Sequence, residues 1–83
     1  IPRRSPRFLR RNALVAMGND GDPGLLQIVA FHAGHPDWLL RAHAVWALAR
    51  IGGEAVRPLL EQLRARERHP DVRAELEAEL AVA

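Results

Sequence analysis

One short pattern occurs three times in this chain of 83 residues and limits what it can fold into. Residues 41–48, RAHAVWAL, align without a gap on residues 10–17, RRNALVAM, at an offset of 31. They align again on residues 73–80, RAELEAEL, at an offset of 32. A repeat of this length is typical of stacked helical hairpins, in which each unit buries its apolar face only against its neighbours. The chain has room for two and a half such units.

The middle copy of the pattern has the spacing of a buried amphipathic helix. Over residues 37–51, the apolar positions are 40, 44, 47, 48 and 51, which lie on one helix face. Asp37 is placed to cap this helix, and Gly52-Gly53 to end it. Further helices are predicted over 6–17, 24–33, 54–68 and 70–82, joined by turns of Gly, Pro and Asp. The sequence therefore predicts an all-α fold, a short α-solenoid of about five helices over residues 6–83, entered by a linker at 1–5.

The three helices that carry the pattern are expected to pack side by side. The residues predicted to be buried along their seam are Leu9, Ala13, Leu40, Ala44, Leu48, Val72 and Leu76. In the last helix Glu75, Glu77 and Glu79 are expected to face water, which is typical of a terminal, capping helix. The charged residues at 61, 64 and 66–68 are assigned to the solvated outer face of the fourth helix.

All basic residues other than histidine are arginines, and they are unevenly distributed. Residues 1–12 hold five arginines and no acid, whereas residues 54–83 hold five arginines against seven acids. Such a basic block indicates an anionic partner near the N-terminal end. Arginine also opens each copy of the repeat, and we expect Arg41 and Arg73 to bind an acid or a carbonyl of the neighbouring turn. Arg10 belongs both to the basic block and to the repeated arginines, so it can bind an anionic partner and also a neighbouring turn.

The basic block is the main candidate binding site. Arg7, Arg10 and Arg11 are spaced i, i+3 and i+4, so their guanidinium groups share a helix face that can contact successive phosphates; the alternative is an ordinary solvated N-terminus. On the central helix Trp46 lies beside a histidine and an arginine. Its ring can stack on a base or, as we favour, pack between neighbouring hairpins. The residues predicted to bind nucleic acid are Arg3, Arg4, Arg7, Arg10, Arg11, Asn12, His43 and Arg50.

The residue types present exclude most chemistry. The chain has no cysteine, threonine or tyrosine, and its one serine, Ser5, lies in the linker, so no set of nucleophile and base can form. His32 and His35 lie across a predicted helix end with no carboxylate on the same face, so no metal site is expected. No segment is long and apolar enough for a membrane span, and none resembles a signal peptide. We therefore expect a cytoplasmic protein without catalytic residues of its own.

Three segments together are more specific than the repeat. In order, RNALVAMGN at 11–19, GDP at 21–23 and RAHAVWAL at 41–48 resemble the C-terminal HEAT-like repeat domain, of the phycobilisome-lyase kind, of epoxyqueuosine reductase. The resemblance extends over about residues 8–80. It implies that the chain is a C-terminal domain excised from a tRNA-modifying oxidoreductase.

The resemblance also implies partners and cofactors. The parent protein would use a cobalamin and two [4Fe–4S] clusters in its preceding domains. None of these groups would bind here, because the clusters need cysteines that this chain lacks. The implied partners are the tRNA anticodon stem-loop and the catalytic domains of the parent. The alternative is a generic HEAT-repeat scaffold for protein–protein interaction, which an exposed apolar patch would favour.

Overall fold

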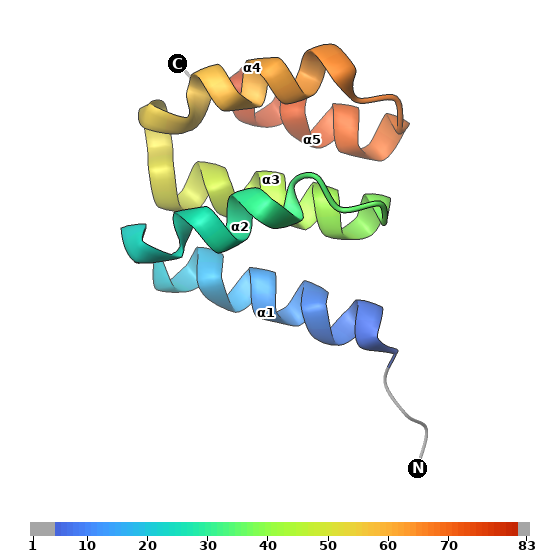
Figure 1. Ribbon diagram of the computed structural model, residues 1–83. Helices are drawn as coiled ribbons and strands as arrows, with labels where there is room; N and C mark the ends of the chain where they lie inside the picture. Colours follow the sequence, from blue (N-terminus) through green and yellow to red (C-terminus); the bar gives the residue numbers. More distant parts are fainter. Residues whose placement is uncertain (1–4, 82–83) are drawn as a thin grey trace.

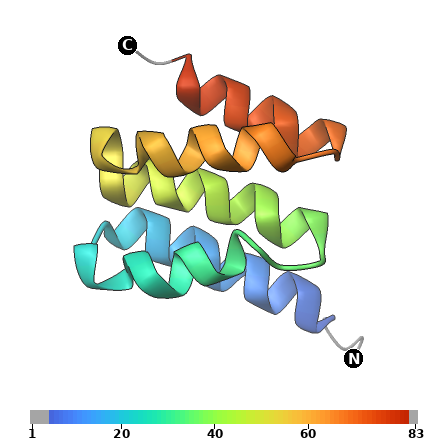
Figure 2. The same ribbon diagram turned by 45° about the horizontal axis from the view of Figure 1, so that its top comes forward.

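The computed structural model describes residues 5–81, which form helices joined by short turns and no strand. The elements in order are α1 (Pro6–Asp20), η1 (Pro23–Leu25), α2 (Leu26–His32), α3 (Trp38–Gly52), η2 (Gly53–Val56), α4 (Arg57–Arg66) and α5 (Pro70–Leu80). Figures 1 and 2 show α1, α3 and α5 side by side in one layer, while α2 packs on α3 and α4 on α5. The predicted all-α solenoid is confirmed. The 3₁₀ turns η1 and η2 make α2 and α4 begin later than predicted.

The three helices of the main layer begin in the same way. Ser5, Asp37 and His69 are their N-caps, and each side chain accepts a hydrogen bond from the backbone N–H two residues further on. This satisfies one of the backbone donors that a helix leaves unpaired in its first turn. At the other end, α1 is closed by Gly21 and α3 by Gly53, with φ of 75° and 55°, a region in which a side chain is strained.

The core is centred on α3, because this helix has neighbours on both sides. Its residues Leu40, Ala44, Val45, Ala47 and Leu48 are each no more than 1% exposed. From α5, Val72 and Leu76 complete the seam at 1% and 0% exposure. Five of the seven seam residues predicted from the sequence are therefore confirmed as buried.

The other two seam residues lie in α1 and are not buried. Leu9 is 54% exposed and Ala13 is also exposed, so this part of the prediction is wrong. The buried residues of α1 are instead Leu14 and Gly18, on a different side of the helix. The reason is the position of α1 at the end of the stack, where it has a neighbour, α3, on one side only. Leu9 and Ala13 lie on its other face. The corresponding face of α3 is the one that packs against α1.

Trp46 packs at the junction of α1 and α3. A Cβ added to Gly18 would lie 2.4 Å from atom Cζ3 of its ring, so the indole occupies the space that any larger residue at position 18 would need. The guanidinium of Arg50 lies 5.4 Å from the centre of the same ring. The indole is thus a packing element, as favoured from the sequence.

The glutamates of α5 are only partly solvated. Glu77 is exposed as predicted, whereas Glu75 and Glu79 are half-buried, so the prediction for these two is wrong. Burial, followed by the hydrogen bond to Glu79 and its negative charge, raises the pKa of Glu75 to about 7. The two side chains are one helical turn apart on the side of α5 that packs on α3, where water cannot surround them fully.

This carboxylate pair makes stability depend on pH. The pKa of Glu75 is higher in the folded chain than its ordinary value of 4.5, so the unfolded chain loses this proton first as the pH rises. Stability should therefore fall between about pH 4.5 and 7 and level off above. We expect Glu75→Gln to raise the free energy of unfolding by about 1 kcal/mol at pH 8, a value reduced for solvent screening, and to leave it unchanged at pH 4. Urea denaturation at both pH values measures this. Glu77→Gln is the control, and equal effects of the two variants would contradict the assignment.

A candidate nucleic-acid interface

The residues predicted to bind nucleic acid are not gathered in one place. Arg3 and Arg4 lie outside the described residues. Four of the others, Arg7, Arg10, Arg11 and Asn12, lie in the first half of α1, and two, His43 and Arg50, lie on α3. The first turns of α1 and the last turns of α3 are at opposite ends of the layer (Figures 1 and 2). The α1 residues and Arg50 are therefore separate candidates for a contact.

Arg7 has a structural partner. Its Nε donates to Oδ2 of Asp37 at 2.8 Å, and its guanidinium lies 5.4 Å from the centre of the Trp38 ring. Burial raises the pKa of Asp37, but the hydrogen bonds from Arg7 and from the Leu39 N–H together outweigh this and keep the pKa below its usual value. Arg7 thus joins α1 to the N-cap of α3, a role that the sequence did not indicate.

Arg10 and Arg11 keep their charge unneutralised. Among residues 5–81, no carboxylate lies within ion-pair distance of either guanidinium. Nε and Nη2 of Arg11 donate to Oδ1 of Asn12 at 3.3 and 3.1 Å, so Asn12 orients this arginine. The Arg11 guanidinium also lies 5.1 Å from the centre of the Phe8 ring, and that ring is 40% exposed.

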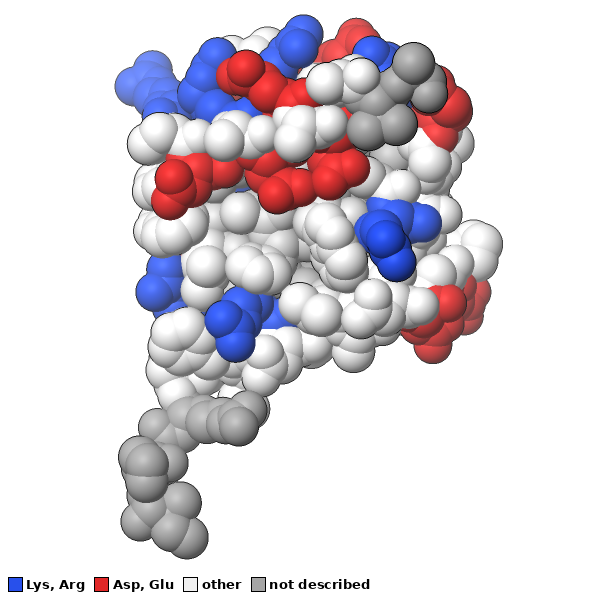
Figure 3. All heavy atoms as spheres, turned by 180° about the vertical axis from the view of Figure 1, so that it is seen from behind, with Lys and Arg blue, Asp and Glu red and all other residues white. Residues whose placement is uncertain are grey.

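The two predicted residues on α3 differ in the contacts that their side chains make. His43 Nδ1 lies 2.8 Å from the carbonyl oxygen of Leu39, so this ring is tied to its own helix. Arg50 is exposed and lies over Trp46. Seen from behind, basic side chains stand singly on the part of the surface nearer to α1, whereas acidic side chains form a row over α5 (Figure 3).

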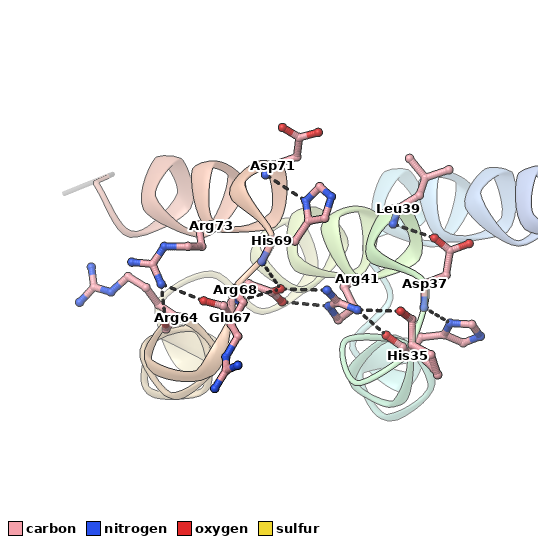
Figure 4. Close-up of polar contacts among 11 residues, drawn as sticks. His35, Asp37, Leu39, Arg41, Arg64, Glu67, Arg68, His69, Asp71 and Arg73 are labelled. Atoms are coloured by element: carbon pink, nitrogen blue, oxygen red, sulfur yellow. Dashed lines mark hydrogen bonds and ion pairs between the residues drawn. The ribbon is translucent and has the colours of Figure 1, made fainter.

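The second arginine of the repeat is held by a carboxylate and two carbonyls. Nε and Nη2 of Arg41 donate to the two oxygens of Glu67, both at 2.9 Å. Its Nη1 donates to the carbonyls of His35 and Pro36 at 3.0 and 2.9 Å. Figure 4 shows this side chain reaching from α3 to both neighbouring loops. The hydrogen bonds from Arg41 lower the pKa of Glu67, although burial opposes them.

The third arginine of the repeat has the same role one unit further along the stack. Nη1 of Arg73 donates to the carbonyls of Glu67 and Arg64 at 2.9 and 3.4 Å. The structural role expected for Arg41 and Arg73 is therefore confirmed. In the first unit the corresponding contact is different. Nη1 of Arg10 lies 3.3 Å from Nε2 of His35, whereas Arg41 is paired with the carboxylate of Glu67.

A groove of about 470 Å³ lies beside these arginines, and the sequence did not predict it. Its walls are the turn at 33–36 and the end of α4 with the residues that follow it. The lining residues are Ala33, Gly34, His35, Pro36, Arg41, Leu63, Arg66, Glu67 and Arg68. The run RARER at 64–68 is the only local signal for it, and such a run is equally typical of a solvated helix end. We call this feature the loop-edge groove.

The comparisons with known proteins identify one family. The family of HEAT repeats matches residues 3–81. No curated protein and no solved structure matches the chain. Within the described range no helix has the length and apolar character to cross a membrane, and the same range holds no group of three or more histidine or acidic residues that could bind a metal ion.

Proposed function

From the premise that this chain belongs to the HEAT-repeat family, we propose that it is a non-catalytic binding module for RNA. In its finer form, the proposal is that the chain is the tRNA-binding accessory domain of an epoxyqueuosine reductase. The cobalamin and the two iron–sulfur clusters would then belong to other domains of a cytoplasmic oxidoreductase. The partners are the anticodon stem-loop of the tRNA and the catalytic domains of the same protein.

The observation that supports this proposal is that two arginines of α1 have no carboxylate partner within residues 5–81. Neither Arg10 nor Arg11 has an ion pair within residues 5–81, and the guanidinium of Arg11 lies 5.1 Å from the centre of the Phe8 ring, which is 40% exposed. Guanidinium groups bind phosphate oxygens through paired N–H donors, and an adjacent aromatic ring offers a surface for a base. The resemblance to epoxyqueuosine reductase over residues 8–80 supports the choice of tRNA.

The proposal is tested with the double variant Arg10→Gln and Arg11→Gln. Each lost phosphate contact should reduce the slope of log K against log salt by about 0.7 to 0.9. Binding of an anticodon stem-loop should weaken about equally for different loop sequences, because phosphates carry no base information. The measurement is a fluorescence titration at several salt concentrations with the fragment and the parent protein. Arg7 is left intact because it holds the Asp37 cap.

The matched control is Arg64→Gln, which removes one exposed guanidinium outside the predicted contacts, and the comparison variant is Arg50→Gln, which removes one at the far end of the layer. Arg50 remains a predicted contact, and an effect of this variant would place part of the RNA on α3. If the double variant in the parent protein binds the stem-loop with unchanged affinity and salt slope, α1 is not the RNA surface.

A second observation favours a protein-interaction scaffold. The exposed large apolar side chains of the described residues all lie on α1 and α2: Phe8 at 40%, Leu9 at 54%, Ile28 at 48% and Phe31 at 75%. Exposed apolar surface of this kind is typical of protein contacts. If the chain is a scaffold, the Arg10 and Arg11 double variant should still bind the partner protein, whereas the Phe31→Ser variant should not.

A further inference from the structure

The free side of the first repeat carries an apolar face of a kind that is covered in the second repeat. We call it the end face and define it by four exposed residues of α1 and α2: Leu9, Ala13, Ala16 and Ile28. The residues 31 positions later are Leu40, Ala44, Ala47 and Leu59. The first three of these are buried, and the last is half-buried and packs on the core. The end face therefore has the residue types with which one repeat packs on another.

The opposite end of the stack does not offer a matching surface. Leu14 of α1 is buried, and α3 is the helix that packs on α1. Val45 holds the same position in α3 and is also buried, whereas α5 has Glu77 there, which is exposed. A copy stacked head to tail would place this carboxylate against apolar side chains, and an unpaired charge is costly to bury. The four residues of the end face are uncharged, so the end face of a second copy matches it better.

The charges of α1 favour one orientation for such a contact. Arg10 and Arg11 lie in the first half of the helix, while Asp20 ends it and Asp22 follows. None of these four side chains has an ion pair within residues 5–81. Two copies of α1 packed antiparallel bring the arginines of each copy to the aspartates of the other, and they also oppose the two helix dipoles. A two-fold axis perpendicular to α1 gives this arrangement, whereas parallel packing sets like charges together.

We propose that two copies of this chain associate through their end faces as a dimer with two-fold symmetry. Each copy uses one end face, so the assembly closes at two chains and leaves the α5 ends outermost. The dimer gives the exposed apolar surface of α1 and α2 a defined occupant, which is the same surface of a second copy. This inference goes beyond the proposed function and does not depend on it.

The area of the end face sets the expected strength of the dimer. A helix of 15 residues such as α1 is about 22 Å long, and two neighbouring helices are about 20 Å wide. Two such faces bury about 900 Å² together, which is the size of weak and transient interfaces. We therefore expect a dissociation constant of about 0.1 mM, so the chain is a monomer at the lower concentrations used to titrate RNA.

Sedimentation velocity of the full chain measures the dimer, at concentrations from about tenfold below to about tenfold above this value. Ala13 lies near the midpoint of α1, so Ala13→Glu brings two carboxylates together at the two-fold axis, and dimerisation should weaken by at least about tenfold. The matched control is Ala74→Glu, the same substitution at an exposed alanine of α5, which should dimerise like the wild type. Thermal unfolding followed by circular dichroism checks that each variant is folded.

A charge reversal tests the orientation of the two copies. Asp20→Arg places a cation opposite the arginines of the second copy, so it should weaken the dimer at low salt and have less effect at high salt, where charges are screened. An unchanged dimer at low salt would overturn the antiparallel arrangement. The backbone NMR signals of Leu9 and Ile28 should shift as the wild-type chain is concentrated, and those of Ala74 should not.

Two results of the sedimentation experiment would overturn the proposal. A chain that stays monomeric at the highest concentration leaves the end face to a helical hairpin of another protein. A dimer that survives Ala13→Glu and is lost in Ala74→Glu is stacked head to tail. If the chain stays monomeric and binds the anticodon stem-loop, the dimer is wrong and the proposed function stands. If the chain dimerises as expected and binds no RNA, the dimer stands and the proposed function is wrong.

Discussion

Leu48→Ala is expected to lower the free energy of unfolding by about 2–4 kcal/mol. Leu48 is 1% exposed at the centre of α3, the one helix within residues 5–81 that has a neighbour on each side in the main layer. Removing the isopropyl group beyond its Cβ leaves a cavity that neither flanking helix can close without moving the other. A domain of this size has a total stability of about 5 kcal/mol, so the loss is a large part of the whole.

Chemical denaturation followed by circular dichroism measures this loss. The control is Leu9→Ala, the same substitution in α1 at a residue that is 54% exposed. We expect a change within about 0.5 kcal/mol there. A Leu48→Ala variant that unfolds at the wild-type denaturant concentration would show that the core is not where the structure places it.

The second large effect is expected for Glu67→Ala. This change leaves the Arg41 guanidinium, whose side chain is 19% exposed, without its carboxylate. It also removes the acceptor of two backbone N–H groups in the turn before α5. Removing one partner of a largely buried pair costs about 3–5 kcal/mol, because a charge is left desolvated and unpaired.

A double-mutant cycle with Arg41→Met separates the pair from its surroundings. The double variant should be more stable than the Glu67→Ala single variant, since no unpaired charge remains. The pKa of Glu67 is lowered by folding, so the pair's contribution is complete above about pH 4.5 and is lost as the pH falls through the lowered value. The control is Glu61→Ala, which removes an exposed i, i+4 pair with Arg57 and should cost at most about 0.5 kcal/mol. Additive effects in the cycle would contradict the coupling.

The parts of the fold that follow from neighbouring residues could be predicted from the sequence. The cap at Asp37 and the glycine stop of α3 depend on residues within one turn of the helix end, whereas α1 continues past the predicted end at 17 to Asp20. The roles of Arg41 and Arg73 could be inferred because the same residue recurs at the same place in each repeat, which indicates a contact made by the stack itself.

The parts that were missed depend on neighbours that are distant in the chain. Leu9 and Leu40 have the same local pattern, and only the number of helices around each decides which is buried. Arg7 pairs with Asp37, which is 30 residues away, so its spacing from Arg10 and Arg11 could not indicate that role. The loop-edge groove was missed for the same reason, because its two walls, the turn at 33–36 and the end of α4, come together only in the folded stack.

The uncovered face of α1 has a consequence for how the stack would be recognised. Leu9 and Ala13 stand at the positions that Leu40 and Ala44 hold one repeat later. If α1 were removed, Leu40 and Ala44 would become the new surface, and the stack would present the same kind of face one layer further along. Removing α1 would therefore relocate the apolar part of the terminal surface, whereas its charges would change, because Arg11 and Asn12 have Ala42 and His43 as their counterparts. A partner that bound only the apolar part would be insensitive to the number of repeats behind it, and a partner that bound the arginines would not.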